Sequence, residues 1–293
     1  MVSVLTLKEV VKTYPRFTLG PLNLNIEQGT AVAVIGPNGS GKSTLFKLIM
    51  NIIKATDGKV ELFGQVVSTE DSILKQQVGY VGDRLTPFGD LNVKKLAAFI
   101  SYWYPNWDQK KYEHLVNRYE IDEQEIFQKC SKGTQKKIEF IFALAHNPKL
   151  LLLDEPSAGV DLLSQRKMKE DLTNYMESGF NSIMMSSHTL DEIKHLCDYL
   201  CMMDNGKVLD VLEKDVIQDN WAKLWVDHLP EALLNESWIL KIENEPLQII
   251  SNNREEAEQV LAENNVTIQH MQKLNIDEAI EYLLYRSREK SSN

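Results

Sequence analysis

Hydrophobic residues along the chain gather into short, nearly continuous runs separated by longer segments of mixed polarity. Residues 30–35, 78–81 and 150–153 are almost entirely apolar, and residues 183–185 form another short apolar run. Runs of this kind are typical of strands buried on both faces of a parallel sheet. The opening segment, residues 2–14, instead alternates and ends at a Tyr-Pro turn, which predicts the first strand of an antiparallel sheet. The pattern predicts an α/β fold.

Residues 92–147 have helical spacing and contain no strong strand. Asn92 is a suitable N-cap for a helix over residues 93–103, and Pro105 to Asp108 separate it from a second helix. Aromatic side chains crowd this break. They could pack in the core or form an exposed patch that docks a partner; they are Phe99, Tyr102, Trp103, Tyr104 and Trp107.

Residues 205–208 predict a turn between two strands, and about 80 residues follow it. The spacing of apolar residues in this last part indicates short strands and helices. The pattern predicts strands at 221–226, 238–242, 246–250 and 266–271, and helices at 253–264 and 276–285. These elements predict a small α+β domain that contains no recognisable set of catalytic residues. It could serve packing and dimerisation, or bind a regulatory ligand.

Composition narrows the class of protein. The 293 residues suffice for two domains, and the net charge of −10 argues against a broad nucleic-acid-binding face. The apolar stretches are too short to span a bilayer, and we expect no signal peptide. Three cysteines suit a reducing cytosol. We expect Cys197 and Cys201 to be small core residues and Cys130 to be packed and inert, unless the start of a helix activates its thiol.

One stretch between a buried strand and a helix predicts a nucleoside triphosphate site. It has the pattern G-x-x-x-x-G-K-[ST], whose glycines let backbone amides turn inward around phosphates. Lys42 can reach the β- and γ-phosphates, and the Ser43 hydroxyl can ligate Mg²⁺. The nine residues are Gly36, Pro37, Asn38, Gly39, Ser40, Gly41, Lys42, Ser43 and Thr44.

Polar side chains at other strand ends complete this prediction. Asp154 and Glu155 end an apolar strand and point to different sides, so we expect Asp154 to hold Mg²⁺ and Glu155 to polarise the attacking water. His188 ends the next strand, where it could contact the γ-phosphate. Tyr14 lies upstream of the loop and could either stack on a nucleobase or pack at the sheet edge.

The stretch Cys-Ser-Lys-Gly-Thr-Gln-Lys-Lys at residues 130–137 resembles the signature of ATP-binding-cassette (ABC) ATPases. The other motifs follow in the order of that family. Tyr14 is similar to the adenine-stacking aromatic, residues 36–44 to Walker A, residues 150–155 to Walker B and His188 to the switch histidine. Residues 157–161, which end at Asp161, resemble the D-loop.

The resemblance implies a P-loop ABC ATPase domain at residues 1–213, with a mixed sheet core, an antiparallel β subdomain and a helical subdomain at about 84–147. Residues 214–293 would form the accessory α+β domain. The family sandwiches two ATP molecules between two subunits, so Ser131, Lys132 and Gly133 would contact the ATP of a partner. One loop and one signature per chain imply pairing, with itself or with a related ATPase subunit.

Two positions depart from the family pattern. Lys132 occupies a signature position where glycine is common in the family. Lysine at this position resembles exporter-type cassettes, and its charge could favour the γ-phosphate. Asp83 stands at the Q-loop position, where Gln is usual; a carboxylate can ligate Mg²⁺ but cannot donate an amide hydrogen bond. We therefore expect altered coupling or Mg²⁺ dependence, and an Asp83→Gln variant with unchanged hydrolysis and transporter stimulation would contradict this.

The resemblance implies an ATP- and Mg²⁺-dependent motor subunit of a membrane exporter, with Glu155, His188 and Lys42 as catalytic residues. The run at residues 102–108 is similar to exporters that have separately encoded permease subunits, whose substrates are drug-, antibiotic- or lipid-like. We expect a peripheral position at the cytoplasmic face of the membrane, held by the permease, and no nucleic-acid partner. The alternative is a soluble or regulatory ABC ATPase without a transport partner.

Overall fold

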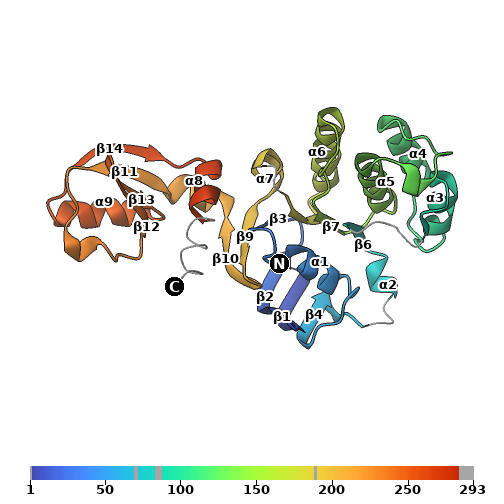
Figure 1. Cartoon of the computed structure of the whole chain (residues 1–293), viewed down its shortest axis with the longest axis horizontal. Coiled ribbons are helices and arrows are strands. Elements are labelled where there is room, and N and C mark those ends of the chain that lie inside the picture. The colour runs from blue at the N-terminus through green and yellow to red at the C-terminus, as the bar shows by residue number, and fades with distance from the viewer. Residues whose placement is uncertain (1, 69–71, 83–87, 188–189, 284–293) are drawn as a thin grey trace. The chain divides into compact units, whose positions relative to one another are not determined.

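A computed structural model of the chain describes residues 2–68, 72–82, 88–187 and 190–283. The chain divides into two compact units (Figure 1). Unit 1 comprises Met1–Cys197 and Cys201–Asp210, and unit 2 comprises Asp198–Leu200 and Val211–Asn293.

A six-stranded sheet in the order β10-β9-β3-β8-β7-β6 forms the centre of unit 1. Strands β6, β7, β8 and β3 run parallel, so their carboxyl ends meet at one edge. Every residue of β3 and β8 is buried, as continuous apolar runs predict. The strands are β3 (Ala31–Ile35), β6 (Val78–Val81), β7 (Leu150–Asp154), β8 (Ser182–Ser186), β9 (Tyr199–Asp204) and β10 (Lys207–Glu213).

A second, antiparallel sheet has the order β2-β1-β4-β5. Its strands are β1 (Ser3–Tyr14), β2 (Phe17–Glu27), β4 (Asp57–Leu62) and β5 (Gln65–Val66). The sequence indicates two short strands where the structure has the single strand β2. Gly20 keeps it continuous: its φ is +102°, and a Cβ there would lie 2.1 Å from the Val10 carbonyl oxygen, where β1 is irregular.

The helices of unit 1 begin largely where polar caps predict. Asn92 accepts a hydrogen bond from the Lys95 amide and starts α3, and Asp108 starts α4 in the same way. Helices α3, α4 and α5 lie together in Figure 1, as expected for residues 92–147. The helices are α1 (Lys42–Ile49), α2 (Ser72–Lys75), α3 (Val93–Ser101), α4 (Gln109–Arg118), η2 (Phe127–Lys129), α5 (Lys132–Ala145), α6 (Leu162–Met176) and α7 (Leu190–Leu196).

Unit 2 contains a four-stranded antiparallel sheet in the order β12-β13-β11-β14. One face of this sheet shares a core with α9, in which Trp238 is the largest buried side chain. The sequence indicates these strands and α9 but not α8, whose single fully buried residue, Ile217, gives no helical stripe. The elements are α8 (Lys214–Asn220), β11 (Ala222–Val226), η3 (Glu231–Leu233), β12 (Ile239–Asn244), β13 (Leu247–Ser251), α9 (Arg254–Glu263) and β14 (Ile268–Lys273).

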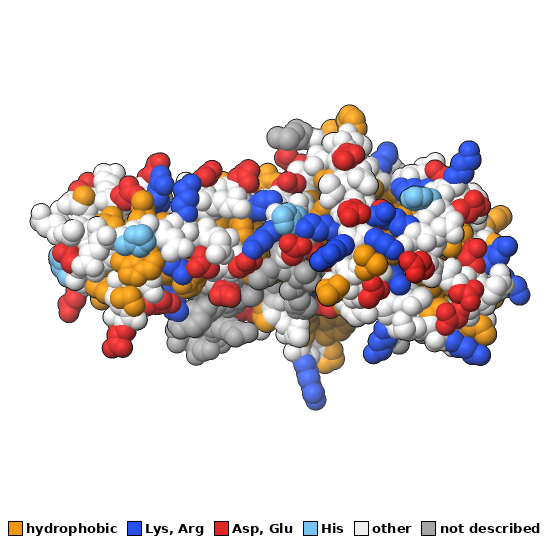
Figure 2. All heavy atoms as spheres, turned by 90° about the horizontal axis from the view of Figure 1, so that it is seen from above, with side chains coloured by type: hydrophobic (Ala, Val, Ile, Leu, Met, Phe, Trp, Pro, Cys, Tyr) orange, Lys and Arg blue, Asp and Glu red, His pale blue; other side chains and the backbone are white. Residues whose placement is uncertain are grey.

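Basic and acidic side chains are interspersed over the face shown in Figure 2. Among the described residues, no helix combines the length and hydrophobicity needed to cross a bilayer.

Two adjacent leucines test the core of unit 2. Leu233 is 4% exposed within the core, whereas Leu234 is 44% exposed. Leu233→Ala should lower the free energy of unfolding by about 2–5 kcal/mol because it leaves a cavity. Leu234→Ala should change it by only about 0.5 kcal/mol. Urea denaturation of both variants measures the difference, and equal shifts would contradict this assignment of the core.

Candidate functional site

The phosphate loop joins the buried strand β3 to helix α1, and its glycines allow its shape. A Cβ at residue 36 would lie 2.0 Å from the Met203 carbonyl oxygen, so only glycine fits beside β9. Gly39 and Gly41 have φ values of +84° and +106°, which other residues rarely adopt. Ser40 is buried, and its carbonyl accepts the Gly206 amide, which fixes the loop to the turn after β9.

Lys42 lies folded over this loop. Its Nζ donates to the carbonyl oxygens of Gly36 at 2.8 Å and Pro37 at 3.0 Å. Burial lowers the pKa of Lys42, while the nearby carboxylates of Glu155 and Asp154 act in the opposite direction. The cap residue of α1, Gly41, has no side chain that hydrogen-bonds the first turn. The start of α1 is therefore suited to an anion.

A cleft of about 260 Å³ opens above the loop. Glu155, from the end of β7, faces the same cleft as the loop, although more than 100 residues separate them in sequence. The structure thus brings together most of the predicted loop residues and the predicted base. The lining residues are Phe17, Asn38, Gly39, Gly41, Lys42, Ser43, Thr44 and Glu155.

Ser186, at the end of β8, hydrogen-bonds to Asp154, the last residue of β7, and to the backbone of Glu155, the next residue. Its hydroxyl donates to Asp154 Oδ1 at 2.7 Å and accepts the Glu155 amide at 3.1 Å. Asp154 and Ser186 are register partners on adjacent parallel strands, so the sheet itself fixes this contact. Sequence reasoning missed Ser186, and only its place beside the predicted His188 could have pointed to it.

Phe17 is a second residue that sequence reasoning missed. It lines the cleft, whereas Tyr14 lies beside it, with ring centroids 6.4 Å apart and planes at 28°. Tyr14 is 38% exposed and Lys12 Nζ lies 5.5 Å from its ring centre. Both residues lie where β1 turns into β2. Phe17 lines the cleft, and Tyr14 packs against Phe17.

The signature residues begin helix α5, and none of them lines the cleft of their own chain. Ser131 caps this helix by accepting the Thr134 amide at 3.1 Å, and both Ser131 and Lys132 are exposed. Gly133 is buried against the predicted D-loop, because a Cβ there would lie 2.3 Å from the Gly159 carbonyl oxygen.

Asp161 ends the predicted D-loop and caps α6. Its carboxylate accepts the Ser164 amide at 2.9 Å, and this hydrogen bond is the main cause of its lowered pKa. Lys137 of α5 lies 3.7 Å from the same carboxylate. The signature helix and the D-loop are therefore in direct contact. Two other predicted site residues, Asp83 and His188, lie outside the described residues.

The donor set around the loop suits Mg²⁺. Ser43 offers a hydroxyl and Asp154 a carboxylate, both of them hard oxygen ligands. Within the described ranges, no group of three or more His, Cys, Asp or Glu residues could hold a metal on its own.

The predicted aromatic cluster divides between core and surface. Tyr104 packs on His146 with ring centroids 4.0 Å apart, and Trp107 packs near Phe142. Phe99, Tyr102 and Trp103 are 40%, 83% and 56% exposed. Tyr104 and Trp107 therefore pack against neighbouring rings, whereas Phe99, Tyr102 and Trp103 are exposed.

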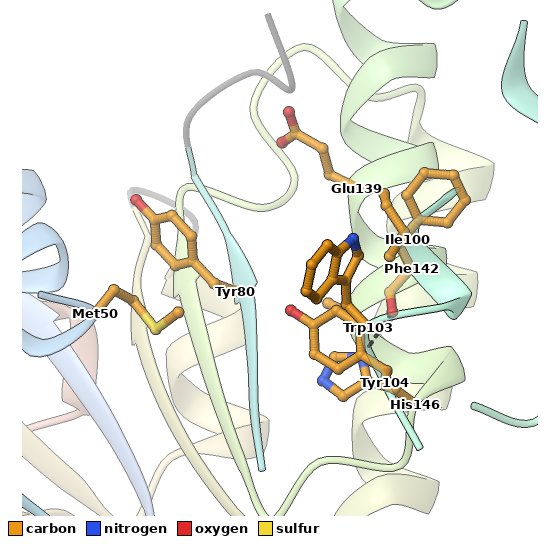
Figure 3. Close-up of a pocket in the computed structure, with 9 residues that line it drawn as sticks. Met50, Tyr80, Ile100, Trp103, Tyr104, Glu139, Phe142 and His146 are labelled. Atoms are coloured by element: carbon orange, nitrogen blue, oxygen red, sulfur yellow. Dashed lines mark hydrogen bonds between the residues drawn. The ribbon is translucent and has the colours of Figure 1, made fainter. Parts of the chain in front are cut away.

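A second pocket, of about 320 Å³, lies next to this cluster and is called the aromatic groove here. Figure 3 shows Met50 and Tyr80 on one side and the aromatic side chains with Glu139 on the other. The lining residues are Met50, Tyr80, Ile100, Trp103, Tyr104, Glu139, Phe142, Ala143 and His146.

Comparison with known proteins gives consistent matches to one family. A profile described as ABC transporter matches residues 19–158. The lantibiotic transport ATP-binding protein SrtF of Streptococcus pyogenes is 30% identical, covering 72% of this chain and 90% of SrtF. The ABC transporter ATP-binding protein YtrB of Bacillus subtilis is 29% identical, covering 70% of each chain.

A solved structure supports the same fold. It is a dimeric ATP-binding cassette in a post-hydrolysis state with bound ADP and phosphate. The TM-score is 0.63 at 23% identity, over 71% of this chain and 98% of the cassette. The predicted mixed α/β P-loop fold with its antiparallel β subdomain is confirmed.

The cysteines give a direct test of the packing at the signature. Burial and the nearby Glu125 carboxylate raise the pKa of Cys130 to about 11, and its thiol donates to the Ile126 carbonyl. Cys197 and Cys201 are fully buried, as predicted. At pH 8 only about a thousandth of Cys130 would be thiolate. The native chain should therefore resist iodoacetamide while the denatured chain reacts at all three thiols; rapid native labelling of Cys130 would contradict this packing.

Proposed function

Because the chain belongs to the ABC transporter family and is an ATP-binding ATPase, we propose that it is the motor subunit of a membrane exporter. It would work in a dimer with two composite ATP sites, paired with itself or with a related subunit. The observation that carries this proposal is the shared cleft of the phosphate loop, Lys42 and Glu155.

ATP binding would replace the contacts that Lys42 makes within the loop. Its ammonium group lies on the carbonyl oxygens of Gly36 and Pro37, and a bound β- or γ-phosphate would draw it into the cleft. The amides of residues 38–44 and the uncapped start of α1 would hold the remaining phosphate oxygens. Phe17 or Tyr14 would stack on the base.

Ser43 and Asp154, with Asp83, would hold Mg²⁺ between the protein and the phosphates. When bound, the cation supplies charge neutralisation for the transferred phosphoryl group. The Ser186 hydroxyl supports this role because it fixes one oxygen of the Asp154 carboxylate. Glu155 would orient the attacking water and take its proton, and His188 would contact the γ-phosphate.

The second half of each site would come from the partner ATPase subunit. Ser131 and Lys132 are exposed at the start of α5, where a hydroxyl, a positive charge and the helix end can meet the γ-phosphate of another subunit. Their absence from the cleft of their own chain supports this arrangement. Asp161, at the start of α6, would lie at the same interface.

The permease would dock at the aromatic groove. An apolar, partly open pocket bordered by the exposed Trp103 is suited to a helix that inserts side chains. The chain would then lie at the cytoplasmic face of the membrane through that contact. The similarity to SrtF, a lantibiotic transport protein, supports a transport role. We propose that the direction is export and that the permease selects drug-, antibiotic- or lipid-like substrates. Residues 1–213 would be the ATPase domain and residues 214–293 an accessory domain.

Replacing the proposed base tests the catalytic assignment. Glu155→Gln keeps the shape of the side chain but removes the proton acceptor, so kcat should fall by roughly 100-fold or more while ATP still binds. Size-exclusion chromatography with saturating ATP should show a dimer. Retained hydrolysis would contradict the role of Glu155, and a chain that stays monomeric would contradict the composite site.

Two exposed aromatic residues provide a matched test of docking. Trp103→Ala should reduce co-purification of the permease from native membranes, because it removes a large apolar contact from the groove. Phe180→Ala removes a similarly exposed ring, 69% exposed, that does not line the groove and should leave recovery unchanged. Equal recovery with both variants would rule out the groove as the docking site.

A further inference from the structure

The peptide group between Asp154 and Glu155 is held at both of its polar atoms. Its N–H, from Glu155, donates to the carbonyl oxygen and the hydroxyl of Ser186, both at 3.1 Å. Its carbonyl oxygen, from Asp154, accepts a hydrogen bond from Lys136 Nζ at 3.1 Å. The orientation of this one peptide therefore depends on a strand, β8, and on the signature helix, α5.

The backbone at Glu155 needs such support. Its φ is +50°, in the left-handed region that residues with a Cβ seldom adopt. Unfavourable backbone conformations persist where surrounding contacts hold them, and they concentrate at functional sites. This conformation turns the chain at the end of β7 so that the Glu155 side chain lines the cleft instead of continuing the strand.

Lys136 makes a second contact of the same kind. Its Nζ also donates to the Gly82 carbonyl oxygen at 3.1 Å, just beyond the end of β6. Strands β6 and β7 are parallel neighbours, so one ammonium group bridges their carboxyl ends. The side chain is 19% exposed, and the Glu139 carboxylate lies 3.9 Å away. A charged donor with little access to water makes stronger hydrogen bonds than a neutral one.

We propose that Lys136 is a positioning residue for ATP hydrolysis, which holds the Asp154–Glu155 peptide so that Glu155 faces the phosphate loop. This inference rests on the proposed role of Glu155 as the base. Because Lys136 lies on α5, five residues after Ser131, it ties the helix that would meet the partner's ATP to the base of its own site. Movement of the signature helix and orientation of Glu155 are then linked within one chain.

The test compares lysine variants of the full chain, assayed with ATP and Mg²⁺. Lys136→Met and Lys136→Gln remove the charge, and Lys136→Arg keeps a charged donor. Lys111→Met is the matched control, because Lys111 is also partly buried and donates through Nζ, at 2.9 Å, but to Asn147. Steady-state kinetics give kcat and KM, and hydrogen–deuterium exchange reports on the Glu155 amide, independently of turnover.

We expect Lys136→Met and Lys136→Gln to lower kcat by roughly 10- to 100-fold, since a misplaced base loses alignment with the water. KM should stay within about twofold, because the loop that binds ATP is unchanged. The Glu155 amide should exchange faster in both variants, because the Asp154–Glu155 peptide loses the hydrogen bond from Lys136. Lys136→Arg should restore most of kcat, and Lys111→Met should match the unaltered chain in both measurements.

Unchanged kcat and unchanged Glu155 exchange in Lys136→Met or Lys136→Gln would overturn the inference, as would equal losses in kcat and in ATP affinity. Adding Lys136→Met to Glu155→Gln should cause no further loss, because both changes act through the same side chain. If Glu155→Gln itself leaves hydrolysis intact, the proposed function fails at its base. If Glu155→Gln abolishes hydrolysis and Lys136→Met does not affect it, only the role of Lys136 fails.

Discussion

The uncapped start of α1 is the constraint on which the site depends. Helices α3, α4, α5 and α6 each begin at an Asn, Asp or Ser whose side chain accepts a backbone amide of the first turn. Helix α1 begins instead at Gly41, in the left-handed conformation and without such an acceptor. Its first amides are therefore left without a side-chain acceptor from the cap residue, and with the helix dipole they could bind an anion in the cleft.

The parallel sheet gathers the other predicted site residues beside the loop. Strands β3, β7 and β8 end at the same edge, so the loop, the two acids and Ser186 meet although they are distant in sequence. The contacts at this edge involve backbone atoms as much as side chains. Gly36 touches β9, Gly133 touches the D-loop, and the peptide before Glu155 is held from two sides. Small changes in strand or helix position would therefore shift Glu155 directly.

Much of this arrangement could be predicted because local spacing determines it. The phosphate loop, the acids at the end of β7 and the cap at Asn92 are each formed by residues close together in sequence, so short sequence patterns predict them. The contacts of Ser186 and Lys136 could not be predicted, because they join residues 18 to 54 positions apart and depend on strand register and helix placement. Phe17 could not be predicted for a similar reason. The turn between β1 and β2 places it at the cleft, and its distance from the loop in sequence does not indicate this. Helix α8 lacks a periodic apolar stripe, so its residues gave no signal.

We propose that the nucleotide site is complete only when two ATPase subunits meet. Specific ATPase activity of the purified full chain, measured over a dilution series at saturating ATP and Mg²⁺, tests this claim most directly. If the active species is a dimer, specific activity should fall as dilution separates the subunits, and it should recover on concentration. Specific activity that stays constant at concentrations where the chain is monomeric would contradict the account.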